Sequence, residues 1–290
     1  MRVDEIAAPG EGPYGVVAGP DGALWVTLVH AGAVVRVAPD GRLERFDVGA
    51  GSGPTVITTG PDGAAWFSRM RDGRLGRITT AGEQTSIAVA GSPYGIAVGP
   101  DGTVWFTDTT ADRIGRISAE GVLDAVELPV TGGFAAMITV TPDGAAWFTL
   151  NQANAVGRIA PTGEVDLFPL PTEGAAPVGV AAAPDGAVWF AEIGAGAIGR
   201  ITPDGAITEF PLPDRAGRPH AVAPDAAGGC WFTEWAGNRV GHVDAGGTVR
   251  SVDLPTPDSE PHGLVIGPDG TVHAALEIGS LARVGPSDLS

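Results

Sequence analysis

A tryptophan recurs along the chain at a nearly constant interval. Six tryptophans are separated by 41, 39, 42, 42 and 42 residues, and one further step of 42 residues leads to His273. Repeats of about 40 residues indicate an architecture in which each copy forms one supersecondary unit. The 290-residue chain therefore contains seven repeats. The six tryptophans are Trp25, Trp66, Trp105, Trp147, Trp189 and Trp231.

Each repeat places turn and strand residues in the same order. The fullest copy contains Pro-Tyr-Gly from Pro93, Pro-Asp-Gly from Pro100, Trp-Phe-Thr from Trp105 and Ile-Gly-Arg-Ile from Ile114. Asp-Gly between two short β-branched runs predicts a tight hairpin. A second hairpin is expected after each Gly-Arg-Ile segment, which makes four antiparallel strands per repeat. The pattern predicts an all-β, seven-bladed β-propeller of four-stranded antiparallel blades.

The two ends of the chain predict how the ring closes. Only six residues follow Val284, so the last repeat has no room for its fourth strand. Residues 3–9 resemble the fourth strand of another repeat, at residues 207–213. We expect the N-terminal strand to complete the last blade, because closure removes an open sheet edge. Residues 1–290 are expected to form a single domain.

Composition restricts the class of function. The chain has 45 glycines and 25 prolines, but they recur with the repeat and accompany 43% hydrophobic residues, which indicates a buried core. A net charge of −17 argues against nucleic acid and anionic membranes as partners. Neither an apolar span nor a signal-peptide pattern is present, so we expect a cytoplasmic protein. All 17 basic residues are arginine and Cys230 is the single cysteine, which leaves His, Asp, Glu, Tyr, Ser and Thr for chemistry.

Function is sought where equivalent positions of the repeats differ, because the repeated residues serve the fold. The position 11 residues before each tryptophan begins the first strand, at one mouth of the central channel. It carries both tyrosines of the chain and two of its five histidines. In ring order the residues are Tyr14, Thr55, Tyr94, Ala136, Val178, His220 and His262.

Two further positions at the same mouth carry a carboxylate only in the seventh repeat. Glu277 lies four residues after the tryptophan position, at the end of the second strand, and Glu260 lies two residues before His262. Antiparallel pairing brings these three residues to one mouth, with His220 on the neighbouring blade. A lone surface acid or histidine is usually structural, but two carboxylates and two histidines in one place favour a functional site.

This residue set points to metal-assisted proton transfer. Two carboxylates without cysteine suit a hard cation such as Mg²⁺. A neighbouring cation disfavours protonated histidine, so His262 would remain neutral and could accept a proton. The metal could stabilise negative charge on a carbonyl oxygen while the adjacent C–H loses its proton. The pattern fits proton abstraction beside a carbonyl, and it leaves elimination and hydrolysis open.

The other histidines are interpreted as structural. His242 stands where five repeats have arginine, and His273 replaces the repeat tryptophan and is expected to pack between blades. His30 has no acidic neighbour in the sequence and is expected to be a solvated loop residue. Three acids that follow their tryptophan by three residues should point away from the side that carries Glu277. They are Asp108, Glu192 and Glu234.

The departures from the repeat resemble a known family. The segments Arg218-Pro219-His220 and Glu260-Pro261-His262-Gly263, together with the repeated pattern, are similar to those of the virginiamycin B lyase (streptogramin B lyase) family. The resemblance spans essentially the whole chain. It implies a monomeric propeller that inactivates type B streptogramin antibiotics, which are small cyclic depsipeptides. It further implies Mg²⁺-dependent elimination at the threonyl ester, a carbon–oxygen bond cleavage that consumes no water.

The resemblance also implies roles for residues at matching positions. Glu260 and Glu277 would hold Mg²⁺, His262 would be the catalytic proton-transferring residue, and His220 would contact the substrate. Aromatic residues at the rim would bind the ligand's bulky rings. These rim residues are Tyr14, Tyr94 and Trp235.

Two other functions remain open from the sequence. A metal-dependent lactonase or esterase propeller could use the same four central residues on another substrate. A non-catalytic propeller could bind a ligand at one face. The concentration of unusual residues in the seventh repeat favours an enzyme.

Overall fold

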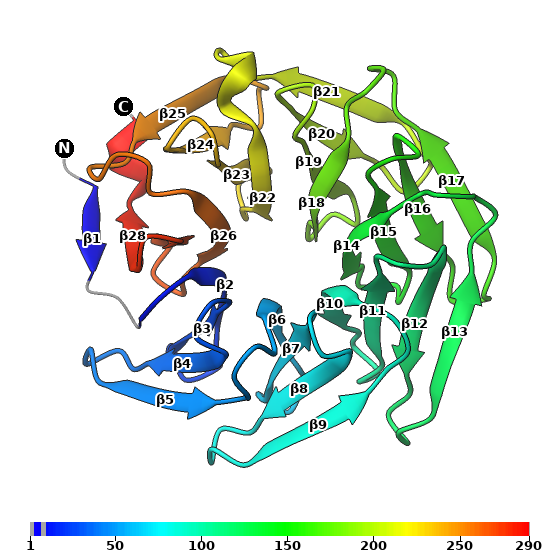
Figure 1. Ribbon diagram of the computed structural model, residues 1–290. Helices are drawn as coiled ribbons and strands as arrows, with labels where there is room; N and C mark the ends of the chain where they lie inside the picture. The colour runs from blue at the N-terminus through cyan, green and yellow to red at the C-terminus, as the bar shows by residue number, and fades with distance from the viewer. Residues whose placement is uncertain (1–2, 7–9, 290) are drawn as a thin grey trace.

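The computed structural model describes residues 3–6 and 10–289 and shows seven four-stranded antiparallel sheets arranged in a ring (Figure 1). This arrangement confirms the predicted propeller. The first strand of each blade faces the central axis and contacts the first strands of both neighbouring blades. These inner strands are β2 (Pro13–Ala18), β6 (Pro54–Thr59), β10 (Pro93–Val98), β14 (Ala135–Val140), β18 (Pro177–Ala182), β22 (Pro219–Pro224) and β26 (Pro261–Ile266).

The remaining strands follow outward in chain order within each sheet. The second strands are β3 (Leu24–Leu28), β7 (Ala65–Arg69), β11 (Val104–Asp108), β15 (Ala146–Leu150), β19 (Val188–Glu192), β23 (Cys230–Glu234) and β27 (Val272–Leu276). The third strands are β4 (Ala33–Val37), β8 (Arg74–Ile78), β12 (Arg113–Ile117), β16 (Ala155–Ile159), β20 (Ala197–Ile201), β24 (Arg239–Val243) and β28 (Ser280–Val284). The outer strands are β5 (Leu43–Asp47), β9 (Gln84–Ala88), β13 (Leu123–Glu127), β17 (Val165–Pro169), β21 (Ile207–Pro211), β25 (Val249–Asp253) and β1 (Asp4–Ile6).

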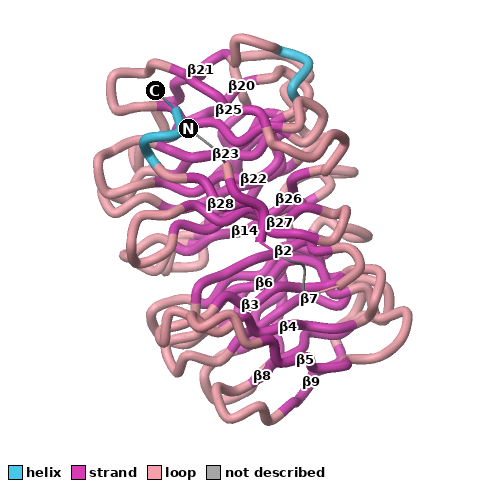
Figure 2. The backbone as a smooth tube through the Cα atoms, turned by 90° about the vertical axis from the view of Figure 1, so that its left-hand side faces the viewer, coloured by secondary structure: helices cyan, strands magenta, loops and turns pink. Residues whose placement is uncertain are grey.

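In the part of the chain that the structure describes, helix is confined to two short 3₁₀ segments, η1 (Arg215–Gly217) and η2 (Pro286–Leu289). Figure 2 shows them at the edge of a body made of strands and loops. Among residues 3–6 and 10–289 there is no helix of the length and hydropathy that crossing a bilayer requires.

The N-terminal strand closes the ring as predicted. β1 pairs antiparallel with β28, and Glu5 stands opposite Ala282. The Glu5 carboxylate also accepts hydrogen bonds from the backbone nitrogen (3.0 Å) and hydroxyl (2.7 Å) of Thr256, in the loop after β25. The first and seventh blades are therefore joined by the outermost strand (Figure 1). Ala7, Ala8 and Pro9, which were included in the predicted strand, lie outside the described residues.

The repeated residues build the packing between and within blades. Phe106 of β11 lies over Gly115 of β12, where a Cβ atom would stand only 2.0 Å from the ring, so glycine is required at this close approach. Trp105 on the same strand lies beneath the guanidinium of Arg116, 5.7 Å from the ring centroid. Such pairs add a cation–π contact to the buried area of the ring. The motif Trp-Phe-Thr facing Ile-Gly-Arg-Ile is thus a packing motif.

The structural histidines take the places that the repeat predicts. His242 stands opposite Trp231, with ring centroids 4.8 Å apart, and its Nε2 lies 2.6 Å from Asp225. It therefore substitutes for the repeat arginine, as predicted. His273 is half-buried, stands opposite Arg283 of β28 and lines a pocket between the seventh and first blades to which Leu24 also contributes. Its packing against the first blade stays a prediction, because the two blades leave a pocket at this place.

Candidate active site

Four candidate residues occupy the second position of an inner strand. Tyr14, Tyr94, His220 and His262 lie in β2, β10, β22 and β26, where the pairing with the second strand shifts register. Such a bulge bends a strand and re-aims the side chain that it carries. The four side chains come from different blades and meet at the axis of the ring.

A buried threonine ties His262 to the neighbouring blade. The Thr233 hydroxyl on β23 accepts from the backbone nitrogen of Ala221 at 3.1 Å and donates to the carbonyl oxygen of His262 at 2.8 Å. The equivalent hydroxyl of Thr149 donates to Val178 at 2.6 Å. The threonine of the Trp-Phe-Thr motif therefore fixes the residue at the next blade's mouth, a role that the sequence reasoning missed.

Tyr14 is the centre of the aromatic cluster. Its hydroxyl lies 2.5 Å from that of Tyr94 and 3.4 Å from Nε2 of His220. Its ring stacks on that of His262, with centroids 4.3 Å apart. The His220 and His262 rings meet edge to face at 4.9 Å. The structure thus brings together both tyrosines and both histidines that the repeat comparison selected.

The seventh-blade carboxylates lie beside His262. Glu260, His262 and Glu277 each offer one ligand atom, and these atoms lie within 4.8 Å of one another. His262 Nε2 is 2.5 Å from Oε2 of Glu277, whereas its Nδ1 is buried without a hydrogen-bond partner among the described residues. Two carboxylates and one imidazole are a donor set that fits a hard divalent cation.

His30 corrects the sequence analysis. We expected a solvated loop residue without an acidic partner, but its Nε2 lies 2.6 Å from Oε1 of Glu277. His30 is half exposed, and the two residues are 247 positions apart in the chain. Ring closure brings the first blade against the seventh. The contact was missed because only residues near His30 in the sequence were considered as its partners.

Glu260 is held in a backbone conformation that most residues avoid. Its φ is 48°, in the left-handed region, and the equivalent residue Gly12 has φ 72°. A side chain with a Cβ atom costs about 1–2 kcal/mol in this region, and such strain is common at functional sites. The left-handed conformation recurs at the equivalent position of three other blades, in Phe134, Ala176 and Arg218. The turn therefore projects side chains at the mouth, and only the seventh blade places a carboxylate there.

Burial keeps both central histidines neutral near pH 7. It lowers the pKa of His220 to about 3, and neighbouring His262 acts in the same direction. Burial also lowers the pKa of His262, and it outweighs the opposing effect of the Glu277 carboxylate. Burial opposes ionisation of Glu277, but hydrogen bonds from His30 and His262 outweigh it and lower the pKa of that carboxyl. The site therefore combines a neutral imidazole with an ionised carboxylate.

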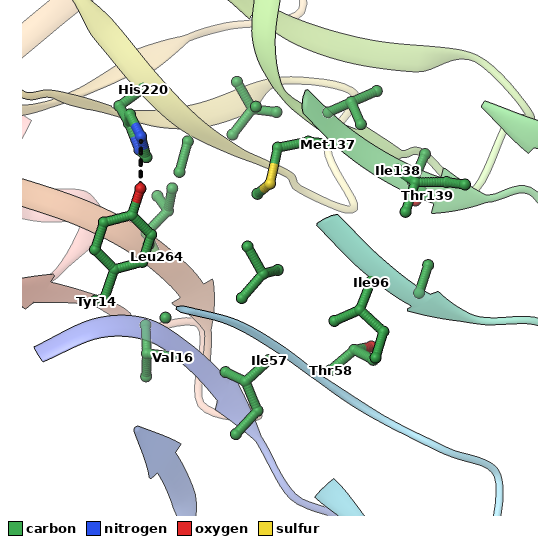
Figure 3. A pocket seen from close by; sticks show the side chains of 18 residues that line it. Tyr14, Val16, Ile57, Thr58, Ile96, Met137, Ile138, Thr139, His220 and Leu264 are labelled. Carbon is green, nitrogen blue, oxygen red and sulfur yellow. Dashed lines mark hydrogen bonds between the residues drawn. The ribbon is translucent and has the colours of Figure 1, made fainter. Parts of the chain in front are cut away.

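A pocket lined by residues of all seven inner strands adjoins the aromatic cluster. It has a volume of about 200 Å³, and Tyr14 and His220 stand at its edge (Figure 3). Ile57, Ile96 and Met137 line it from three different inner strands. The hydrogen bonds of Tyr14 to Tyr94 and His220 cross the axis between blades.

Trp235 lies at this mouth on the sixth blade. Its backbone nitrogen donates to the carbonyl of Arg218, and the guanidinium of Arg218 lies 6.0 Å from its ring centroid. Arg218 has no carboxylate partner within ion-pair distance among residues 3–6 and 10–289. The pair presents an aromatic face and a free positive charge. Arg218 was not among the predicted site residues. The sequence signal that could have found it is its place two residues before His220, which is equivalent to that of Glu260 before His262.

Comparisons with known proteins identify the family and agree with the fold. The model of the virginiamycin B lyase family matches residues 1–284. The chain belongs to this family. A solved streptogramin B lyase structure superposes with a TM-score of 0.94 at 36% identity, covering 98% of this chain and 97% of the other. Family membership confirms the resemblance that the motifs indicated.

Two further relatives support the assignment. A Staphylococcus aureus virginiamycin B lyase, solved as a catalytically inactive histidine-to-alanine variant with quinupristin, has a TM-score of 0.93 at 35% identity, over 97% of this chain and 98% of that one. The virginiamycin B lyase of Saccharopolyspora erythraea is 56% identical over 88 residues. That segment covers 30% of this chain and 29% of the relative.

Proposed function

We propose that the protein is a Mg²⁺-dependent carbon–oxygen lyase that linearises type B streptogramin antibiotics at their threonyl ester. The proposal is carried by the convergence of Glu260, His262 and Glu277 within 4.8 Å at the mouth of the ring. Family membership supports the lyase chemistry. The quinupristin held by the Staphylococcus aureus homologue supports a cyclic depsipeptide as the substrate class.

His262 is the proposed base. Its Nδ1 is buried, and its Nε2 lies 2.5 Å from Oε2 of Glu277, a contact in which the neutral imidazole donates its Nε2–H to the carboxylate. When Glu260 and Glu277 hold the cation, Nε2 would give up this contact and the proton would reside on Nδ1, which frees the Nε2 lone pair to take up the threonyl α-proton. The electron pair of the C–H bond forms the Cα=Cβ double bond, and the Cβ–O bond breaks to release the ester carboxylate. Glu277, 2.5 Å from Nε2, stabilises the resulting imidazolium. The products are a dehydrated residue and a free carboxylate in one linear chain.

His220 is a positioning residue for the substrate. Because its pKa is lowered to about 3, it is neutral at physiological pH and is a poor proton donor to the leaving group. A departing carboxylate is stable without a proton near pH 7. His220 therefore acts as a hydrogen-bonding group beside Tyr14. Tyr14, Tyr94 and Trp235 provide the aromatic surfaces for the depsipeptide rings.

Glu260 and Glu277 are the proposed ligands of the metal. A divalent cation such as Mg²⁺, when bound there, supplies a Lewis acid that stabilises negative charge on a carbonyl oxygen. Glu260 directly precedes β26 and Glu277 directly follows β27, so both lie at the same end of this hairpin, where the Glu277 backbone nitrogen donates to the Glu260 carbonyl at 3.3 Å. The left-handed turn places the Glu260 side chain, and the contacts with His30 and His262 place that of Glu277.

A ring-opening assay tests this function. Quinupristin is incubated with the purified protein, with Mg²⁺ and with EDTA, and the product is followed by mass spectrometry and chromatography. We expect a linear product with Mg²⁺, and its loss with EDTA, in His262→Ala and in Glu260→Gln. Circular dichroism shows whether the variants keep the fold. Turnover that persists in EDTA or in folded His262→Ala would contradict the proposal.

A further inference from the structure

The carboxylate of Glu277 stands between two histidines from different blades. Its Oε2 lies 2.5 Å from Nε2 of His262, within the seventh blade. Its Oε1 lies 2.6 Å from Nε2 of His30, which follows β3 of the first blade. Each oxygen of the carboxylate therefore has one imidazole partner. Nothing in the fold requires the second contact, because the first blade is already joined to the seventh through packing.

The backbone around His30 directs its ring toward Glu277. Gly12, the first-blade equivalent of Glu260, adopts φ 72° and accepts a hydrogen bond from Val29 at 2.8 Å. A Cβ atom on Gly12 would lie 2.5 Å from Cδ2 of His30. The imidazole consequently fills the space that a side chain takes at this position in the seventh blade. The first blade contributes His30 to the mouth in place of a rim side chain.

We propose that His30 is a positioning residue that holds Glu277 in the orientation needed to bind the divalent cation. The inference rests on the proposed metal site. A glutamate at a strand end has several accessible rotamers, and fixing them before the metal binds removes part of the entropy cost of ligation. Hydrogen-bonded partners of metal ligands commonly contribute a factor of about 10–100 to metal affinity. His30 does not contact the reacting atoms of the substrate.

The chain offers a matched control for His30. Arg71 lies at the same position of the second blade, five residues after Trp66, and packs on Gly53 as His30 packs on Gly12. A Cβ atom on Gly53 would lie 2.8 Å from the Arg71 side chain. Arg71→Ala therefore removes a comparable surface side chain without touching Glu277. His30→Gln keeps an N–H donor near the place of Nε2 and serves as the rescuing variant.

Binding of Mn²⁺ alone tests the inference independently of turnover. The dissociation constant is measured by electron paramagnetic resonance of free Mn²⁺ for the whole chain and its variants. We expect His30→Ala to weaken Mn²⁺ binding by about 10–100-fold, with the midpoint of thermal unfolding without metal unchanged. His30→Gln and Arg71→Ala should bind Mn²⁺ as the unmodified protein does. The rate of His30→Ala should recover as the metal concentration rises.

The results of the Mn²⁺ binding experiment distinguish a wrong role for His30 from a wrong metal site. If the unmodified protein binds Mn²⁺ and Glu277→Gln abolishes binding, while His30→Ala binds normally, the role of His30 is wrong and the metal site stands. An equal loss in His30→Gln and His30→Ala also overturns the hydrogen-bonding role. If the unmodified protein does not bind Mn²⁺, both the metal site and the role of His30 are refuted.

Discussion

Glu192 shows how one side chain can depart from its equivalents around the ring. It ends β19 at the position of Asp108 on β11, and both carboxylates are buried. Asp108 is bound by Arg113, five residues later, whereas the residue five after Glu192 is Ala197. Neither oxygen of Glu192 has a hydrogen-bond partner among the described residues. Burial, followed by the charge of Glu209, raises the pKa of Glu192 to about 8.

This difference predicts a pH-dependent stability. Because the folded chain holds a proton on Glu192 to about pH 8 and the unfolded chain releases it near pH 4.5, stability falls as pH rises between these values. Glu192→Gln should therefore be more stable than the unmodified protein, by about 3 kcal/mol at pH 7, and equal to it below pH 4. Urea unfolding across this pH range provides the measurement.

Asp108→Asn is the control of opposite sign. Burial opposes ionisation of Asp108, but hydrogen bonds from Thr110, Ser92 and Arg113 outweigh it and lower the pKa of that carboxyl. Its stabilising effect is present above the unfolded pKa and is lost in acid, so Asp108→Asn should be destabilised at pH 7. Equal pH profiles for the two variants would contradict the assigned protonation of Glu192.

The predictable part of the site consists of residues that can be compared within the repeat. His262, Glu260 and Glu277 were found because one blade departs from six others at positions that share a mouth. His30 was missed because its partner belongs to the far end of the chain. Alignment of the repeats predicts which end of a strand a residue occupies. It does not predict side-chain contacts between the first and seventh blades, which meet only when the ring closes.

At the level of elements, the inner strands carry four candidate residues of the site, whereas the other strands of each blade mainly repeat the packing motif. The hairpins and four strands of each blade were predictable from Asp-Gly turns and alternating apolar residues. The register shift at the start of every inner strand was not, because a bulge leaves no clear mark in the hydrophobic pattern. This shift places His262 where Thr233 can hold its carbonyl.

Thr233→Val tests that coupling between strands. Valine has a similar shape but leaves the backbone nitrogen of Ala221 and the carbonyl of His262 without their partner, which should cost about 1–3 kcal/mol of stability. We also expect kcat to fall, since His262 loses its tie to the sixth blade. Thr149→Val removes an equivalent pair of bonds that does not hold a proposed catalytic residue.

Stability and steady-state kinetics of the two variants distinguish the roles. Both should lose similar stability in urea unfolding, and only Thr233→Val should show the reduced kcat. A kcat that falls equally in both variants would mean that the hydroxyls serve the ring as a whole and do not position His262.

At the scale of the whole molecule, seven repeats generate one asymmetric mouth. The ring brings Tyr14 of the first blade into contact with Tyr94, His220 and His262 from three other blades. The presence of these residues at one mouth was predictable, but their contacts depend on how narrow the axis is and on the bulges. Closure through β1 also sets the first blade against the seventh, so His30 can reach Glu277.

Whether an oxygen atom from water enters the product is the most direct test of the proposed elimination. The protein is incubated with Mg²⁺ and a type B streptogramin in ¹⁸O-labelled water, with His262→Ala as the control, and the product is analysed by mass spectrometry. Elimination predicts a linear product with the mass of the intact antibiotic, without ¹⁸O, that is absent in the control. A product heavier by one labelled water would contradict the account and show that the same site performs hydrolysis.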